Sequence, residues 1–240
     1  MVKTNKSFTK RLKVTKDGKV LSRKSGIGSG DTAVITASAD DDDVNGIDSG
    51  SAYVFTRSGT TWSQQAKLTS SDGAAGDLFG VRVALSGDTA LIGAHFDDDN
   101  GEESGSAYVF VRSGTAWSQQ AKLAASDGAA GDWFGYSVAL SGDTALIGAG
   151  SVDNSASGVD SGSAYVFTRS GTIWREHAKL TAFDGAAGDQ FGGKVALSAD
   201  TALIGARLDD DEMKGVDSGS AYMFTDVPGG DHDGIAKYRQ

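Results

Sequence analysis

The chain has 240 residues; 39% of them are apolar, 34 are glycine, one is proline and none is cysteine. A chain of this length can bury a sizeable core, and the lack of cysteine excludes disulfides and thiolate metal sites. The net charge of −10 is unevenly spread: nine Lys/Arg and one Asp give residues 1–26 a charge of +8, and residues 27–240 carry −18 from thirteen Lys/Arg and 31 Asp/Glu. No apolar run approaches the length of a membrane span, so no membrane-spanning segment is expected.

The first 26 residues form a basic N-terminal arm. The arm lacks the apolar segment and small-residue cleavage site of a signal peptide. A basic segment beside an acidic body is typical of a contact with nucleic acid or another polyanion. The candidate RNA-binding residues are Lys3, Lys6, Lys10, Arg11, Lys13, Lys16, Lys19, Arg23 and Lys24.

The order of residues in the arm is specific. KT-x-K-S begins at Lys3, KR-x-KVT at Lys10 and GK at Gly18. This order resembles the start of the bacterial ribosomal large-subunit protein thirty-five family, although that family's basic, helical second half is missing. The resemblance implies ribosomal RNA as partner and a cytoplasmic location. A fused or misjoined reading frame, or a leader without function, is the alternative.

After the arm, one sequence unit recurs four times along the chain. GDTA at Asp31 becomes GDTALIGA around Asp88 and Asp143, and ADTALIGA around Asp200. Asp88 and Asp143 are 55 residues apart, and Asp143 and Asp200 are 57 apart. SGSAYVF, or SGSAYMF in the last copy, follows in each unit, and DGAAGD links three of the units to the next. A fixed period in this range is typical of a repeat architecture.

Each unit predicts four β-strands. In the third unit they are residues 134–141, 143–149, 161–169 and 172–182, bounded by Gly, Ser and Asp clusters. The inner runs ALIGA and AYVF are apolar almost throughout, as expected for a sheet covered on both faces. The sequence therefore predicts an all-β fold, an arc of about four four-stranded propeller blades. The expected segments are the arm 1–26, the repeats 27–76, 77–131, 132–188 and 189–225, and a tail 226–240.

Both ends of the array are expected to be incomplete. The basic segment stands where the first strand of the first blade should begin, and that repeat is recognisable only from about Gly30. After Phe224 the tail DVPGGDHDGIAKYRQ shows no strand pattern, so no fourth strand is expected there.

The repeats carry a second resemblance. Phe-Gly pairs stand at residues 79–80, 134–135 and 191–192, and Gly-Ala pairs at 93–94, 148–149 and 205–206. They resemble the FG-GAP family, the propeller repeats of integrin α-chain heads and of many microbial surface proteins. The resemblance implies a binding or adhesion module, secreted or on the cell surface, that belongs to a longer array. That family's calcium loop is absent, since only LSGDT or LSADT stands between FG and GA.

The acidic loops are the candidate metal sites. Calcium takes six to eight oxygen ligands, which clustered carboxylates in a flexible loop can supply. The alternative is a solvated loop whose charge keeps the array soluble and blunts strand edges. The loop spacing matches neither an EF-hand nor the integrin loop. The strongest candidates are Asp97, Asp98, Asp99, Asp209, Asp210 and Asp211.

The other recurrent residues favour structural roles. Asp residues of DGAAGD can bond their own backbone, and Trp62, Trp117 and Trp174 recur at one repeat position, which favours packing over a sugar platform. Trp133 stands outside this series. The three histidines fall at unrelated repeat positions, so no catalytic set is suggested and an enzyme is not expected. The leading hypothesis is a non-catalytic module that binds a protein or glycan, with calcium as candidate cofactor; the alternative is a ribosome-associated protein that binds RNA through the arm.

Overall fold

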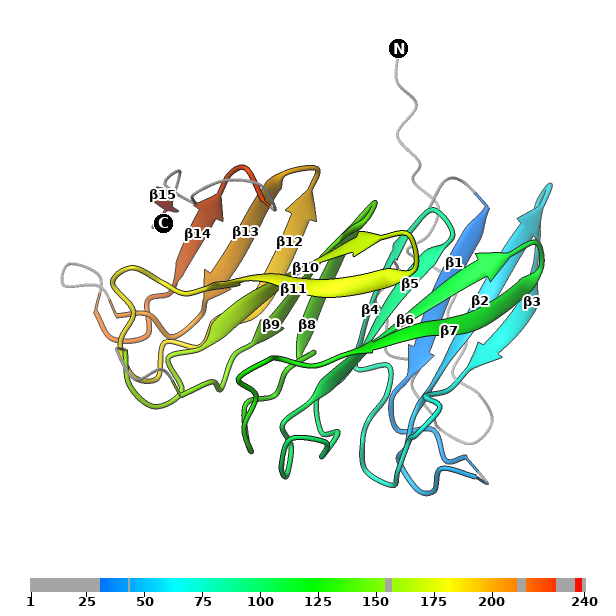
Figure 1. Cartoon of the computed structure of the whole chain (residues 1–240), viewed down its shortest axis with the longest axis horizontal. Coiled ribbons are helices and arrows are strands. Elements are labelled where there is room, and N and C mark those ends of the chain that lie inside the picture. Colours follow the sequence, from blue (N-terminus) through cyan, green and yellow to red (C-terminus); the bar gives the residue numbers. More distant parts are fainter. Residues whose placement is uncertain (1–30, 43, 154–156, 211–214, 228–235, 239–240) are drawn as a thin grey trace, which may run out of the picture.

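The computed structural model describes residues 31–42, 44–153, 157–210, 215–227 and 236–238. Within these ranges the chain forms four antiparallel sheets and no helix, so no helix there could cross a membrane. The sheets stand side by side in an open arc, with the first and last sheets at its two ends (Figure 1). The prediction of an all-β arc of about four propeller blades is confirmed.

The four sheets are numbered as blades in chain order. Blade 1 consists of β1 (Thr32–Ala37), β2 (Ser51–Ser58) and β3 (Thr61–Leu68). Blade 2 consists of β4 (Arg82–Ser86), β5 (Thr89–Ala94), β6 (Ser106–Ser113) and β7 (Ala116–Leu123). Blade 3 consists of β8 (Ser137–Ser141), β9 (Thr144–Ala149), β10 (Ser163–Ser170) and β11 (Ile173–Leu180). Blade 4 consists of β12 (Phe191–Ser198), β13 (Thr201–Ala206), β14 (Ser220–Phe224) and β15 (Ala236–Tyr238).

The second strand of each blade explains the nearly continuous apolar runs. All six residues of β5 are buried, and five of the six residues of β9 are buried. These strands lie inside their sheets and are covered by a neighbouring blade on each face, so alternation between apolar and polar residues is lost.

The prediction that no fourth strand follows the third strand of blade 4 is wrong. Strand β15 pairs with β14, with Lys237 opposite Tyr222, as Lys179 lies opposite Tyr165 in blade 3. An Ala-Lys-apolar triplet therefore ends the fourth strand in both blades. Three residues are too few to show an alternating pattern, which explains the error. The expected loss of the first strand of blade 1 concerns residues outside the described ranges.

A separate hydrophobic core fills each gap between neighbouring blades. Between blades 2 and 3, Leu91 and Val109 face Phe134, Tyr165 and Phe167. The Phe134 ring lies edge-on, 5.5 Å from the Tyr165 ring and 5.9 Å from the Phe167 ring. Phe134 is 1% exposed and Tyr165 is fully buried. The Phe of each Phe-Gly pair is thus the main aromatic residue of a junction.

Close backbone contact explains why glycine precedes the third strand. The Phe134 amide donates to the Ser104 carbonyl at 3.0 Å, which ties blade 3 to blade 2. Gly105 has a φ of 84°, and a Cβ there would lie 2.1 Å from the Phe134 carbonyl oxygen. Only glycine fits both the backbone angle and the contact.

Candidate functional site

The acidic loops and the inter-blade links emerge at the same end of the blades. Because neighbouring strands of a blade are antiparallel, the loop after the second strand and the link after the fourth strand share one end (Figure 1). In blade 2 these segments are residues 95–105 and 124–136. We call this the loop end.

The first carboxylate of an acidic loop is buried against the third strand. Asp97 is 3% exposed and accepts hydrogen bonds from the Ser106 hydroxyl at 2.9 Å and the Tyr108 hydroxyl at 2.8 Å. Both donors belong to the SGSAYVF motif, so the repeated Ser and Tyr have a polar partner in the loop. A buried carboxylate with such donors avoids the cost of losing water.

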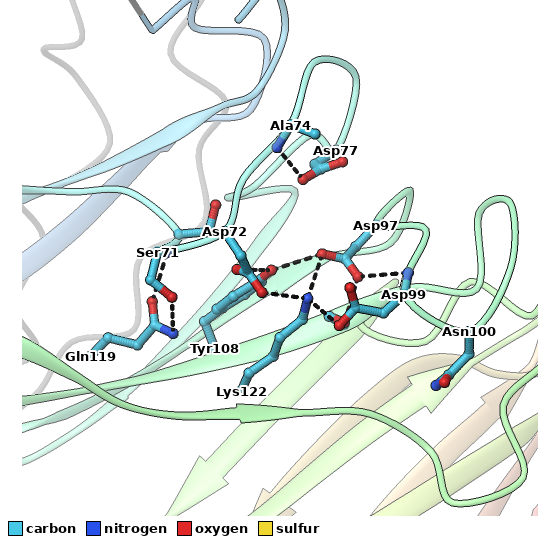
Figure 2. A network of polar contacts seen from close by, with 12 residues as sticks. Ser71, Asp72, Ala74, Asp77, Asp97, Asp99, Asn100, Tyr108, Gln119 and Lys122 are labelled. Atoms are coloured by element: carbon cyan, nitrogen blue, oxygen red, sulfur yellow. Dashed lines mark hydrogen bonds and ion pairs between the residues drawn. The ribbon is translucent and has the colours of Figure 1, made fainter. Parts of the chain in front are cut away.

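A lysine ammonium lies among three carboxylates at the same place (Figure 2). Lys122 Nζ lies 2.8 Å from Asp72, 3.0 Å from Asp97 and 2.5 Å from Asp99. Asp72 comes from the link between blades 1 and 2, so the cluster joins a link to an acidic loop. Burial alone would lower the pKa of Lys122, but its hydrogen bonds to the three carboxylates outweigh burial and raise the pKa above its ordinary value.

The Tyr108 hydroxyl completes this network. It also lies 3.0 Å from Asp72, in addition to its contact with Asp97. Burial and the two carboxylates raise the pKa of Tyr108, so the hydroxyl stays protonated and donates.

The second carboxylate of the loop, Asp98, accepts a hydrogen bond from the backbone of its own loop. Asp98 Oδ1 accepts from the Glu103 amide at 2.8 Å, and Glu103 has a φ of 57°. The carboxylate therefore holds a residue in the left-handed region, which is costly for a side chain other than glycine. The same contact recurs in the other blades between Asp41 and Asp48, Asp153 and Asp160, and Asp210 and Asp217.

The candidate metal ligands thus have separate protein partners. Asp209 accepts from Ser220 and, at 3.3 Å, from Tyr222, as Asp97 does in blade 2, and Asp210 holds its loop as Asp98 does. Asp211 lies outside the described residues. The described ranges contain no group of three or more His, Cys, Asp or Glu side chains placed to hold a metal ion. Calcium binding at these loops stays a prediction, and around Asp97 the Lys122 ammonium already supplies positive charge.

Blade 3 departs from this pattern at one residue. Val152 stands where blades 1, 2 and 4 have Asp40, Asp97 and Asp209, and it is 3% exposed. The Ser163 hydroxyl, whose counterpart Ser106 bonds to Asp97, is buried and has no hydrogen-bond partner in the described part of the chain.

We expect the substitution Val152→Asp to be tolerated at neutral pH. The new carboxylate would meet the Ser163 hydroxyl and, by analogy with Asp97, the side chains of Tyr165 and Lys179. We expect a loss of less than about 1 kcal/mol in the free energy of unfolding, measured by urea denaturation, although an unpaired buried polar group costs about 2–7 kcal/mol. Val166→Asp, in the middle of β10, is the control and should cost several times more. Equal losses would show that a carboxylate has no prepared place in blade 3.

The DGAAGD links are ordered by their own carboxylates. Asp132 Oδ2 accepts from the Ala129 amide at 2.8 Å, and Asp77 and Asp189 make the same contact with Ala74 and Ala186. Burial raises the pKa of Asp77 and Asp132, and the Ala amide bonds only partly offset this effect. The favoured structural role of these Asp residues agrees with these contacts.

Two of the three recurrent tryptophans, Trp117 and Trp174, pack across the junctions. Trp174 donates from Nε1 to Gln120 of blade 2 at 3.0 Å, and the Arg169 guanidinium lies 5.2 Å from its ring centre. Trp117 makes the same bond to Gln65 of blade 1 at 2.9 Å. These contacts give Trp117 and Trp174 a packing role. The Trp62 ring lies 5.5 Å from the Arg57 guanidinium of its own blade.

Trp133 belongs to an aromatic cluster that the repeat does not predict. Its ring lies 6.1 Å from His95, 6.0 Å from Phe96 and 6.0 Å from Tyr136. His95 and Phe96 come from the acidic loop of blade 2, and Trp133 and Tyr136 flank the Phe-Gly pair of blade 3. We call these four residues the aromatic cluster; all but His95 are partly exposed.

Two cationic side chains flank this cluster. The Arg82 guanidinium and the Lys194 ammonium lie 5.3 Å and 5.1 Å from the Tyr136 ring centre. Burial, and to a lesser degree Arg82, lower the pKa of His95 to about 4, so this imidazole is neutral at neutral pH. His95 Nδ1 and Arg82 Nε are buried without a hydrogen-bond partner among the described residues.

Sequence reasoning found the acidic loops but missed what surrounds them. The strand tyrosines recur in all four units and the lysine of AKL in three, and this recurrence was the available signal for Tyr108 and Lys122. The aromatic cluster has no such signal, because its members occupy four different repeat positions on two blades. The candidate RNA-binding residues of the arm lie outside the described residues.

Comparison with known proteins identifies the repeat. The family model described as FG-GAP repeat matches residues 28–55, 62–110, 117–167 and 174–224, which is more than half of the chain. No curated protein matches the chain significantly.

Two solved structures resemble the fold weakly. One contains Saccharomyces cerevisiae Dbp5 bound to Nup159, Gle1, IP6 and ADP, at 8% identity and a TM-score of 0.46, and covers 88% of this chain and 45% of the matched chain. The other is the N-terminal domain of Nup159, at 8% identity and a TM-score of 0.43, covering 88% of this chain and 46% of that one. The chain thus spans less than half of either matched chain.

Proposed function

Because the chain belongs to the FG-GAP repeat family, we propose that it is a non-catalytic binding module that presents its loop end to a protein or glycan partner. The observation that carries this proposal is the aromatic cluster of His95, Phe96, Trp133 and Tyr136. The cluster lies at the loop end, where Trp133 contacts the acidic loop of blade 2 through Phe96 and Glu103.

The cluster stands out because the blades are otherwise nearly identical. At the position of Trp133 the neighbouring repeats have Leu78 and Gln190, and at the position of Tyr136 they have Val81 and Gly193. A partner that binds one place on an array of similar blades needs residues that the other blades lack. The cluster supplies them.

The chemistry of the cluster suits recognition. Partly exposed aromatic rings offer a large contact area at a small cost in conformational entropy, and their polar ends can form hydrogen bonds. Trp133 Nε1 already donates to Glu103 at 3.0 Å, which fixes the indole orientation. A rigid indole would suit the ring face of a sugar or an aromatic side chain, and the two cations at the neighbouring Tyr136 ring would suit an acidic group. Calcium is the candidate cofactor of such binding.

We expect the substitution Trp133→Gln to weaken binding at least about tenfold, because aromatic anchors dominate interface energies. The fold should survive, since Gln190 occupies the same repeat position with φ 56° against 58° for Trp133. The measurement is binding of the labelled full chain to a glycan array and to a displayed random-peptide library, with affinities of the selected ligands determined for both variants.

The matched control is Gln190→Ala, which changes the same repeat position in blade 4 and should leave binding unchanged. Selection of glycans alone or of peptides alone would define the partner class. If neither array yields a ligand, or if the ligands bind Trp133→Gln as tightly as the original chain, the aromatic cluster is not the binding site.

A further inference from the structure

The three junctions inside the arc follow one rule. Each blade has a leading face, which covers the following blade, and a trailing face, which covers the preceding blade. At the junction of blades 2 and 3 the leading face presents Leu91 and Val109, and the trailing face presents Ile147, Tyr165 and Phe167. The junctions of blades 1 and 2 and of blades 3 and 4 use the corresponding residues.

The leading face of blade 4 is more exposed to solvent than the leading faces of the other blades. Leu203 is 43% exposed, whereas its counterparts Leu91 and Leu146 are fully buried. Met223 is partly exposed, although its counterpart Val166 is fully buried. This face therefore has the apolar residues of a junction, but no neighbouring blade covers them in the described part of the chain.

The trailing face of blade 1 is the matching exception. Ile35 and Phe55 are partly exposed. Their counterparts in blade 2, Ile92 and Phe110, are 0% and 4% exposed. In these strands the two ends of the arc therefore carry the two halves of one type of junction. The segment that corresponds to the Phe-Gly pair and first strand of the other blades lies outside the described residues in blade 1.

We propose that a second copy of this chain covers these faces, with the leading face of blade 4 on the trailing face of blade 1 of the other copy. The three junctions within the chain show what kind of surface covers each face. The residues that would meet, Leu203 and Ile35, are counterparts of pairs such as Leu91 and Ile147 that share a core inside the arc.

The polar rim of a junction supports the same pairing. Arg112 of blade 2 donates from Nη1 to Thr32 of blade 1 at 2.9 Å, and Arg169 of blade 3 donates to Thr89 of blade 2 at 3.1 Å. Arg57 of blade 1 occupies the same repeat position as Arg112 and Arg169, and Thr201 of blade 4 occupies the same repeat position as Thr32 and Thr89. Arg57 and Thr201 would meet only across two copies.

The contact joins two different surfaces, so it is heterologous, and repeated contacts can either close into a ring or extend into an open filament. Two copies of four blades each would close a ring of eight blades if both junctions form, which is within the range of about four to eight blades found in propellers. A dimer is therefore the expected assembly.

The test is sedimentation velocity of the full chain at concentrations up to about 0.1 mM, well above a micromolar dissociation constant. We expect a dimer that Leu203→Lys and Ile35→Asp each convert to a monomer. A mixture of these two variants should again form dimers, since one intact leading face and one intact trailing face remain. Ile173→Lys, at a residue that is 56% exposed on the edge strand β11, is the control and should leave the dimer intact.

Crosslinking gives a second readout that does not depend on substitutions in a face. The chain has no cysteine, so Arg57→Cys and Thr201→Cys, introduced in separate copies, should be joined by a bismaleimide. Arg112→Cys with Thr32→Cys in one copy is the positive control for the reach of the reagent. A monomer at all concentrations, a mixture that stays monomeric, or crosslinking in the control alone would overturn the proposal.

Discussion

The substitution Phe134→Ala is expected to lower the free energy of unfolding by about 3–5 kcal/mol, the usual cost of truncating a buried phenylalanine. Phe134 is 1% exposed and lies edge-on to Tyr165 and Phe167 in the core between blades 2 and 3. Its removal leaves a cavity that backbone movement cannot fill, because the Phe134 amide is bonded to Ser104 and its carbonyl lies against Gly105.

The measurement is guanidinium denaturation followed by far-ultraviolet circular dichroism. The matched control is Phe183→Ala, which makes the same chemical change at a residue that is 62% exposed and should cost less than about 1 kcal/mol. If both variants unfold at the same midpoint as the original chain, the junction cores do not hold the blades together.

The substitution Lys122→Met is expected to cost about 2–4 kcal/mol at pH 7, slightly less than the about 3–5 kcal/mol for breaking a fully buried ion pair. The change removes the ammonium that lies between Asp72, Asp97 and Asp99 and leaves the buried Asp97 carboxylate without its cation. The side chain of Lys122 is 18% exposed, and this partial contact with water moderates the loss.

Two further variants test whether the loss comes from the buried charge cluster around Lys122 or from removing any lysine charge. Lys67→Met removes the counterpart in blade 1, which is 36% exposed and lies 3.1 Å from Asp42, and should cost less than about 1 kcal/mol. Adding Asp97→Asn to Lys122→Met should recover part of the loss, since the uncompensated charge disappears. No recovery in the double variant would mean that the aliphatic stem of Lys122, rather than its charge, stabilises the loop end.

The pH dependence of this loss has a defined sign. Burial alone would raise the pKa of Asp72, but hydrogen bonds from Lys122 and Tyr108 outweigh burial, and the pKa lies below its ordinary value of 3.8. A carboxyl with a lowered pKa stabilises the fold above its ordinary value, and this stabilisation is lost as the pH falls through the folded pKa. The gap between Lys122→Met and the original chain should therefore be constant from pH 7 to pH 5 and shrink below pH 3.8.

The fold was predictable because each unit repeats the same local signals. Apolar inner strands, Gly-containing turns and the Phe-Gly pair recur with little change, so a weak signal in one unit is reinforced by the others. Strand β15 was not predicted because its three residues carry no alternation, and its Ala-Lys-apolar triplet is informative only in comparison with the fourth strands of the earlier blades.

The candidate site was predictable only in part. Clustered Asp residues suggested a metal, but the actual partners of Asp97, which are Tyr108 and Lys122, come from the next two strands of the blade, β6 and β7. Such contacts depend on the register of the sheets, which composition does not reveal. The aromatic cluster depends further on two blades meeting, so no single unit contains it.

The interchangeable junctions have a consequence for how such a gene can change. The leading faces of blades 1, 2 and 3 present Val34, Leu91 and Leu146 to trailing faces that each carry a Phe-Gly phenylalanine. Unequal recombination that removes or duplicates one whole unit would join a leading face to a trailing face of the matching type. The length of the array can therefore drift by whole blades without a new core having to evolve, while the aromatic cluster, which needs two particular neighbours, would be lost whenever they are separated.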